Sequence, residues 1–268
     1  IDGCPAGLSL SEEDIQVYLD RRKPGQSQFT TGRKESDMAQ IWSGVFEGRT
    51  TGTPISILVQ NQDQRSRDYG NIMNTYRPGH ADYTFDEKYG FRDYRGGGRS
   101  SGRETTARVA AGAVAAKSLK ELGIEVHAYT KAIGPVSVPE NEYHPEEIFQ
   151  NPIYMPSNAY AQKASAYLEE CIKNQDSSGG IIECVVTGMP VGIGDTVFEK
   201  LDANLAKAML SIGAVKGFEI GDGFKAADTK GSINNDSFHT KDGRITKDTN
   251  HAGGVLGGMS DGSKIIFR

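Results

Sequence analysis

His80 is the side chain whose surroundings most suggest proton chemistry. It lies in the run Arg77-Pro78-Gly79-His80-Ala81-Asp82, where a Pro-Gly turn separates it from a guanidinium and a carboxylate follows. Histidine exchanges protons near neutral pH, and charged neighbours can hold its ring in one orientation. We therefore interpret His80 as a candidate general acid or base, and a purely structural or solvent-exposed histidine remains the alternative. A metal site begun by His80 and Asp82 would lack further ligands at a suitable spacing.

A loop rich in glycine and arginine follows, over residues 96–104. The spacing of Ser101 and Glu104 is that of a capping box, which predicts that a helix begins here and runs from Thr105 to Leu122. Apolar residues occur on every side of this helix, so we expect it to be largely buried. Free N–H groups at a helix N-terminus attract anions, and glycines let a ligand approach the backbone. Together with Arg99 and Arg103, the loop is a predicted anion-binding site.

Three other interpretations of this loop compete with the anion-binding site. A solvated helix cap with surface arginines needs no ligand and remains open. A Walker-type phosphate loop would end in Gly-Lys-Ser/Thr, and that ending is absent. An RNA-binding Gly/Arg tail belongs to disordered basic segments, whereas this loop leads directly into a predicted helix.

Arginine is concentrated around these motifs in a chain that is acidic overall. The 268 residues carry a formal net charge of -5, which argues against general affinity for nucleic acid. Between Arg65 and Arg108, however, eight arginines and one lysine face six acidic residues. Arginine rather than lysine favours bidentate recognition of carboxylate or phosphate. The sequence thus predicts an enzyme whose site binds discrete small anions.

Composition favours a cytoplasmic protein. No apolar run reaches the roughly 18 residues that a membrane span needs, and no secretory signal pattern occurs. The three cysteines (Cys4, Cys171, Cys184) are odd in number and widely spaced, as expected of reduced thiols. The chain opens with Ile1-Asp2-Gly3 rather than Met, so we expect a piece of a longer protein.

Hydrophobic periodicity predicts the elements that must position these loops. A capping box that starts at Ser9 predicts a helix ending at Pro24-Gly25, with one apolar face (Ile15, Tyr18, Leu19). Alternation predicts strands over 54–60 and 180–186, and helical stripes predict helices over 160–172 and 197–209. Cys171 falls on the stripe of the first of these helices and is a predicted core residue. We interpret the chain as one mixed α and β domain whose sheet topology stays open.

Over its whole length the sequence resembles the chorismate synthase family. The most specific matches are residues 77–82 and the run Tyr94-Arg95-Gly96-Gly97-Gly98-Arg99-Ser100-Ser101-Gly102-Arg103-Glu104-Thr105. Further matching segments are Asp2-Gly3-Cys4-Pro5 and residues 20–25, 43–48, 214–217, 219–224 and 250–254.

The resemblance implies an enzyme of the shikimate pathway to aromatic amino acids. Family members convert 5-enolpyruvylshikimate 3-phosphate into chorismate by an anti-1,4-elimination of phosphate, which makes them carbon-oxygen lyases. Reduced FMN is required although the reaction is redox-neutral overall, and NADPH would be the indirect reductant. The substrate carries two carboxylates and a phosphate, which would account for the local excess of arginine.

The resemblance also implies roles for individual residues. His80 would be the catalytic histidine that protonates the reduced flavin. Substrate anions would be bound by Arg22, Arg77 and Arg103. The FMN contacts would be Arg99, Ser100, Ser101, Gly213, Ala214 and Gly257, and no metal is implied. A nicotinamide phosphate contact would fall at Arg22 and Gln28, where the family often has a basic residue in place of this glutamine.

The implied fold is α+β, a sandwich with helices between two antiparallel sheets, in a homotetramer. Residues 1–268 would be a single chorismate synthase domain truncated at both ends. The family's N-terminal Gly-Glu-Ser-His-Gly motif and its C-terminal Arg-His-Asp and Lys-Pro-Thr-Ser-Ser motifs are not in the sequence. We therefore expect this fragment to bind FMN weakly and to turn over little.

The implied partners are small molecules and copies of the same chain. An external flavin reductase would supply the reduced flavin, and no partner among nucleic acids or membranes is expected. Two other classes of protein compete with the enzyme: an RNA-binding module that uses the Gly/Arg loop, and a non-catalytic flavin- or phosphate-binding protein of the same fold.

Overall fold

The computed structural model of this chain describes residues 1–62, 69–70, 72–96 and 98–268. Gly97 of the glycine-rich loop lies outside the described residues. The same holds for three of the charged residues counted between Arg65 and Arg108, namely Arg65, Arg67 and Asp68. The chain divides into two compact units, Ile1–Ser118 and Leu119–Arg268, and each is described by itself. Among the described helices, none has both the length and the apolar character needed to cross a membrane.

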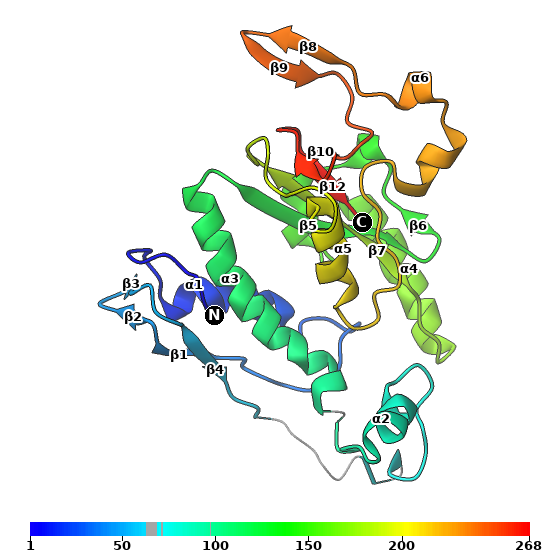
Figure 1. The fold of residues 1–268 in the computed structure, drawn as a ribbon. Helices are drawn as coiled ribbons and strands as arrows, with labels where there is room; N and C mark the ends of the chain where they lie inside the picture. The colour runs from blue at the N-terminus through cyan, green and yellow to red at the C-terminus, as the bar shows by residue number, and fades with distance from the viewer. Residues whose placement is uncertain (63–68, 71, 97) are drawn as a thin grey trace. The chain divides into compact units, whose positions relative to one another are not determined.

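The first unit combines helices with short antiparallel strands (Figure 1). Strand β1 pairs with β4, with Ile41 opposite Ile57, and β2 pairs with β3. The core contains residues from α1, β1 and α3, together with Leu10 and Ile55. The elements of this unit are α1 (Glu12–Arg22), β1 (Ala39–Ser43), β2 (Val45–Phe46), β3 (Arg49–Thr50), β4 (Ser56–Val59), α2 (Asp82–Tyr89), the 3₁₀ turns η2 (Gly98–Ser100) and η3 (Gly102–Glu104), and α3 (Thr105–Glu121), whose last turn extends into the second unit.

Helix α1 confirms the predicted helix, but its start differs from the prediction. The residue at the N-cap is Ser11, and its backbone N–H donates to Oδ2 of Asp14 over 2.9 Å. The capping box predicted to start at Ser9 is therefore wrong, because Ser9 instead bridges to Arg49 in extended conformation. Ile15 and Leu19 are fully buried as predicted, whereas the neighbouring Tyr18 is exposed.

Helix α3 also occurs where it was predicted, but it is buried on one face only. Thr106, Ala110, Ala113 and Val114 are buried, while other residues of the helix, including Ala107, Gly112 and Ala115, are exposed. The expectation of a largely buried helix is wrong, because alanine has so little apolar surface that its exposure costs little.

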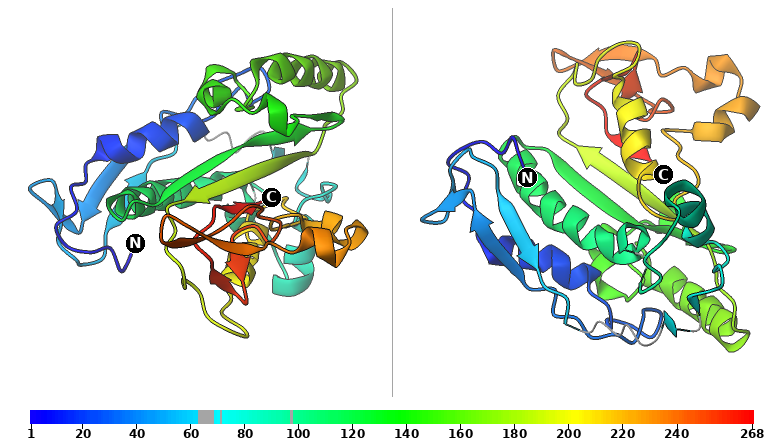
Figure 2. Two further views of the ribbon diagram at one scale, coloured as in Figure 1. Left: turned by 90° about the horizontal axis from the view of Figure 1, so that it is seen from above. Right: turned by 60° about the horizontal axis from the view of Figure 1, so that its bottom comes forward.

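The second unit is built around a four-stranded antiparallel sheet in the order β12-β7-β5-β6. Strands β5 and β7 form its long central pair (Figure 2), with Tyr129 opposite Glu183. The elements are β5 (Glu125–Ile133), β6 (Val136–Ser137), η4 (Glu140–Glu142), η5 (Pro145–Gln150), α4 (Asn158–Lys173), β7 (Gly180–Thr187), α5 (Leu201–Leu210), η6 (Gly223–Asp228), α6 (Gly231–Asn234), β8 (Phe238–Lys241), β9 (Arg244–Lys247), β10 (Val255–Leu256), β11 (Met259–Ser260) and β12 (Ile265–Phe267).

Hydrophobic periodicity predicts the two long helices of this unit, with an error at the start of the second. Helix α4 and strand β7 match the predictions for 160–172 and 180–186. Helix α5 begins at Leu201, four residues after the predicted start at Val197, which is exposed and has φ +65°. A residue with positive φ cannot belong to a right-handed helix, so the apolar Val197 gave a false signal. The α+β class with antiparallel sheets is confirmed.

The three cysteines are free thiols. Cys184, on β7, is buried, and burial together with the nearby Glu183 raises the pKa of its thiol to about 11. A thiol whose pKa is raised in this way stays protonated and is a weak nucleophile, so Cys184 contributes packing rather than reactivity. Cys171, on α4, is half-buried.

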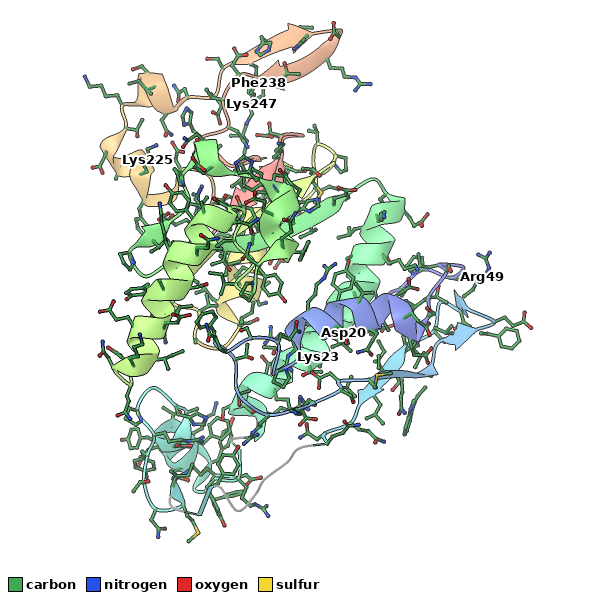
Figure 3. All side chains as sticks on the ribbon, turned by 180° about the vertical axis from the view of Figure 1, so that it is seen from behind. Asp20, Lys23, Arg49, Lys225, Phe238 and Lys247 are labelled. Atoms are coloured by element: carbon green, nitrogen blue, oxygen red, sulfur yellow. The ribbon has the colours of Figure 1, made fainter. Side chains whose placement is uncertain are left out.

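A buried ionic cluster anchors the base of the β8–β9 hairpin, and one of its members, Lys247, is labelled in Figure 3. Nζ of Lys247 lies 2.5 Å from Oδ2 of Asp261 and 3.5 Å from Oδ2 of Asp236, and all three side chains are at least 93% buried. Asp236 also accepts the backbone N–H groups of His251 and Ala252. The cluster thereby ties the hairpin to the loop before β10, where His251 Nδ1 lies 2.8 Å from Oδ2 of Asp222.

Candidate anion-binding site

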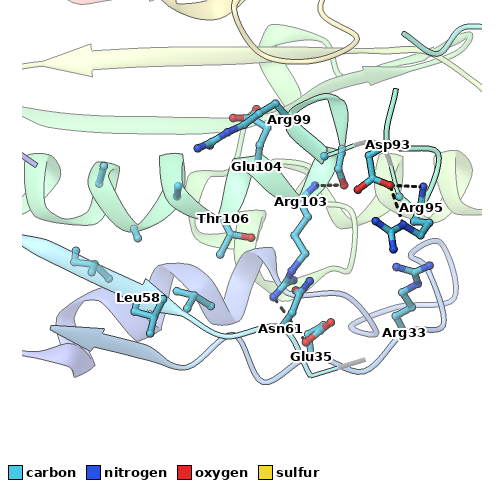
Figure 4. Close-up of a pocket in the computed structure, with 18 of the residues that line it drawn as sticks. Arg33, Glu35, Leu58, Asn61, Asp93, Arg95, Arg99, Arg103, Glu104 and Thr106 are labelled. Carbon is cyan, nitrogen blue, oxygen red and sulfur yellow. Dashed lines mark hydrogen bonds and ion pairs between the residues drawn. The ribbon is translucent and has the colours of Figure 1, made fainter. Parts of the chain in front are cut away.

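A cavity of about 1170 Å³ lies between β4 and α3 in the first unit (Figure 4). Its apolar wall is formed by aliphatic side chains on or beside β4 and by alanines of α3 (Ile55, Ile57, Val59, Ala107, Ala110, Ala111). Its polar end carries four arginines and three acids (Arg33, Arg95, Arg99, Arg103, Glu35, Asp93, Glu104). An apolar wall beside a positively charged end suits a planar ligand that carries anionic groups.

Two of the predicted anion ligands, Arg22 and Arg103, meet on one carboxylate. Oδ2 of Asp37 lies 3.0 Å from Nη1 of Arg22, and its Oδ1 lies 2.8 Å from Nη2 of Arg103. Arg22 comes from the last turn of α1 and Arg103 from η3, at the start of α3. Asp37 is fully buried and has φ +48°, while Arg22 and Arg103 remain 21% and 25% exposed. The site therefore holds two partly accessible guanidiniums on a buried counter-ion.

A hydrogen bond and an ion pair fix these two arginines further. Nε of Arg22 donates to Oγ1 of Thr105 over 3.2 Å. Nη2 of Arg103 lies 3.7 Å from Oε2 of Glu35, whose side chain is almost fully buried. Figure 4 shows Arg103 extending from the start of α3 toward Glu35. Neither Asp37 nor Glu35 was predicted, because a counter-ion far away in sequence leaves no local pattern.

The other two predicted residues, Arg77 and His80, meet on Asp82. Arg77 binds this carboxylate with two parallel bonds, Nε to Oδ2 and Nη2 to Oδ1, each 2.8 Å long. Its backbone N–H also donates to Oδ2 over 3.1 Å, and Nδ1 of His80 lies 2.9 Å from Oδ1. The Arg77 guanidinium holds the pKa of the Asp82 carboxyl well below its usual range, despite burial that opposes ionisation. Asp82 is therefore an ionised, 97% buried centre of the motif.

Arg92, which follows α2, contacts the same carboxylate, with its Nε 3.7 Å from Oδ1 of Asp82. Its Nη2 donates to the backbone carbonyls of Ile72, Met73 and Thr75, and its Nη1 pairs with Asp86. Its guanidinium carbon also lies 5.0 Å from the centre of the Tyr76 ring. The sequence indicates Arg92 only as part of the local positive charge. In the structure, its hydrogen bonds hold the backbone of residues 72–75.

The predicted cofactor contacts fall in both units. In the first, Arg99 and Ser101 line the cavity, Ser100 lies between them in η2, and Oγ of Ser101 accepts the N–H of Arg103 over 3.3 Å. Ser101 thus caps the turn, but the predicted capping box is wrong, because the Ser101 hydroxyl accepts from Arg103 rather than from Glu104, and the Glu104 side chain pairs with Arg108.

The remaining cofactor contacts, Gly213, Ala214 and Gly257, belong to exposed turns of the second unit. Ala214 has φ +67°, and a Cβ placed on Gly213 or Gly257 would meet nothing within 4 Å. These turns leave the backbone open to a ligand.

Comparison with known proteins gives a consistent result. The family model described as chorismate synthase matches residues 1–268. A chorismate synthase of Agathobacter rectalis is 65% identical over all of this chain and 73% of its own length, and one of Methanocella arvoryzae is 53% identical over the same shares. A crystal structure of chorismate synthase superposes with a TM-score of 0.83 at 32% identity, covering 99% of this chain and 77% of that one.

Proposed function

Because the chain belongs to the chorismate synthase family, we propose that its arginine clusters bind the substrate of that family's reaction. The function is that of a chorismate synthase, a carbon-oxygen lyase of aromatic amino acid biosynthesis. The reaction is the anti-1,4-elimination of phosphate from 5-enolpyruvylshikimate 3-phosphate to give chorismate.

The pairing of Arg22 and Arg103 on Asp37 carries this proposal. Each guanidinium has five N–H donors, and Asp37 occupies one donor of each. The buried carboxylate orients both groups and leaves other donors to face an incoming carboxylate or phosphate. Arg77, held by two bonds to Asp82, is a third anion ligand of the same kind.

Reduced FMN fits the cavity of the first unit. The aliphatic wall suits the faces of a flavin ring, and the arginines at the other end suit its polar groups. Arg99, Ser100 and Ser101 would hold it there. For Gly213, Ala214 and Gly257, contact with FMN is a prediction from the family resemblance. When bound, the reduced flavin supplies electron density that helps the phosphate to leave.

The roles of the protein's own side chains are positional and acid–base. The arginines bind and orient the three anionic groups of the substrate, and His80 donates a proton within the site. A positioned side chain of this kind usually contributes about 10²–10⁴-fold to the rate.

Family membership also supports proposals about the reductant of the flavin, the location of the enzyme and its assembly. NADPH serves as the indirect reductant of the flavin, through an external flavin reductase. The enzyme works in the cytoplasm, and it assembles as a homotetramer.

Anaerobic assays test the proposed function. Phosphate release is measured with the full-length protein, reduced FMN and 5-enolpyruvylshikimate 3-phosphate, while flavin fluorescence follows FMN binding with and without substrate. Phosphate release that depends on both ligands supports the proposal. FMN binding without release would identify a non-catalytic flavin-binding protein, and gel shifts of RNA that weaken with salt would identify an RNA-binding module.

A further inference from the structure

We propose that Thr106 is a further ligand of the cofactor, whose hydroxyl forms a hydrogen bond with a polar atom of the flavin ring when FMN occupies the cavity of the first unit. The inference rests on the proposed function, which places reduced FMN in this cavity. It adds a residue to which the family resemblance assigns no role, and it states which part of the flavin that residue contacts.

The hydroxyl of Thr106 is buried without a hydrogen bond. The residue keeps 7% of its surface exposed, and Oγ1 has no hydrogen-bond partner among the described residues. A buried hydroxyl without a partner is unfavourable, and folded proteins pair the large majority of such groups. Thr106 also belongs to the lining of the cavity. An unpaired polar group in a cavity wall indicates a partner that enters the cavity.

The neighbouring threonine shows a satisfied hydroxyl at the same helix start. Oγ1 of Thr105 donates to the carbonyl oxygen of Gly102 over 2.7 Å and accepts the Nε–H of Arg22 over 3.2 Å. A threonine within a helix often bonds in this way to a carbonyl three or four residues before it. Four residues before Thr106 this carbonyl is that of Gly102, which already accepts from the side chains of Thr105 and Arg22. The hydroxyl of Thr106 is therefore left over.

Thr106 lies where the cavity lining changes from charged to apolar. Arg103, Thr106 and Ala110 all line the cavity and follow one another at helical spacing along η3 and α3. Arg103 belongs to the charged end and Ala110 to the apolar wall. Figure 4 shows Thr106 pointing from α3 toward the strand that carries Leu58. A hydroxyl at this boundary meets the part of a ligand where an apolar surface gives way to polar atoms.

A flavin ring changes character in the same way along its length. One end is a methylated benzene ring, and the other end carries ring nitrogens and two carbonyl oxygens on its edge. With the benzene end against the aliphatic wall, the polar edge comes to the side of the arginines and of Thr106. A threonine hydroxyl donates and accepts, so it suits either a carbonyl oxygen or a ring nitrogen. Two χ1 rotamers are open to threonine in a helix, so a rotation that exchanges hydroxyl and methyl group brings Oγ1 to the ligand without backbone movement.

The direct test is the affinity of the full-length protein for FMN, measured by anaerobic calorimetric titration with reduced FMN. Thr106→Val is the sharpest variant, because valine has nearly the shape of threonine and a similar helix propensity but no hydroxyl. We expect its Kd for FMN to rise about five-fold, which corresponds to one net hydrogen bond. Thr106→Ser keeps the hydroxyl and should bind FMN as the wild type does.

Thermal unfolding of the free protein supplies a second readout, which a merely structural hydroxyl would move in the other direction. Thr106→Val loses no hydrogen bond in the absence of FMN, so its melting temperature should equal or exceed that of the wild type. Thr105→Val makes the same chemical change where the hydroxyl has two bonds, and its melting temperature should fall. Ser118→Ala is the control for FMN binding, because its hydroxyl donates to the carbonyl of Val114 in the same helix and lies outside the cavity lining. It should leave the Kd for FMN unchanged.

The outcomes separate this inference from the proposed function. An unchanged Kd in Thr106→Val, in a protein whose wild type binds FMN, would overturn the role of Thr106 and leave the proposed function intact. A lower melting temperature of free Thr106→Val would also overturn it, because the hydroxyl would then have a partner without the cofactor. A wild type that does not bind FMN would remove the proposed function together with the inference.

Discussion

Arg103 donates a 2.8 Å hydrogen bond to Asp37, a side chain with no exposed surface. A buried carboxylate is tolerated only when charged or polar partners satisfy it, and here Arg22 supplies the second guanidinium. The two arginines that are proposed to bind substrate therefore also stabilise the first unit. Variants of this cluster must be judged by binding and by stability together.

Replacing Arg103 by alanine should weaken substrate binding and lower stability. Losing one charged hydrogen bond to the buried Asp37 should cost about 1.5–3 kcal/mol of unfolding free energy, and KM for the substrate should rise about ten-fold or more. Urea unfolding and steady-state phosphate release measure the two effects. Arg108→Ala, at a more exposed side chain paired with Glu104, is the control and should change stability by less than about 0.5 kcal/mol. An unchanged KM at full stability would remove Arg103 from substrate binding.

Replacing His80 by alanine should lower turnover by about 10²–10⁴-fold, because the positioned acid is lost. Binding of FMN should change little, because His80 is proposed to donate a proton and not to hold the cofactor. Anaerobic phosphate release with reduced FMN measures the rate. His127→Ala is the matched control, because this histidine is about half exposed on β5 and pairs only with Glu125 among the described residues. A rate near that of the wild type would exclude His80 from the mechanism.

The Asp236–Lys247 cluster should make stability depend on acid pH. Burial alone would raise the pKa of Asp236, but the N–H groups of Ala252 and His251, the Thr249 hydroxyl and Lys247 together lower it to about 2. A carboxyl whose pKa is lower in the folded than in the unfolded protein adds stability above its ordinary value near 3.8, and loses that stability as the pH falls toward about 2.

Urea unfolding between pH 6 and pH 3 tests this dependence. The wild type should lose more unfolding free energy on acidification than Asp236→Asn, which has no carboxyl to protonate. Asp248→Asn, at a largely exposed position, should behave like the wild type. The same acid sensitivity in Asp236→Asn as in the wild type would contradict the assignment.

Two glycines should respond to alanine with opposite signs. Gly221 has φ +58°, and a Cβ there would lie 2.1 Å from the carbonyl oxygen of His251. Gly221→Ala should therefore destabilise the protein by more than about 1 kcal/mol. Gly112 lies in the middle of α3 with nothing within 4 Å of its Cβ position, so Gly112→Ala should stabilise by about 0.5–1 kcal/mol. Thermal unfolding of both variants gives the signs, and a stabilised Gly221→Ala would disprove the predicted clash.

Local sequence patterns account for much of the fold. The helices at 12–22, 105–121 and 158–173 and the strand at 180–187 follow from periodicity, because each buries a regular stripe or alternating face. The β8–β9 hairpin was not predicted, although Asp242-Gly243 is a strong signal for its two-residue turn.

The errors arise where the folded backbone departs from the local pattern. Ser9 fits a cap by its spacing but pairs with Arg49, and Val197 fits the helical stripe but lies in a turn with positive φ. In the site, Asp82 stands in the same short motif as His80 and was visible in the sequence. Asp37 was not, because only the folded backbone brings it to Arg22 and Arg103.

The backbone of Asp37 also limits how this position can change during evolution. Its φ of +48° is readily adopted by glycine, asparagine and aspartate and disfavours most other residues. Glycine would relieve the backbone but remove the carboxylate that Arg22 and Arg103 share, leaving Arg103 with the more distant Glu35. Asparagine would remove the negative charge. Glutamate keeps the charge but carries one more methylene into a space with no exposed surface. Aspartate alone meets all the constraints, so we expect lineages that diverge widely elsewhere to keep it.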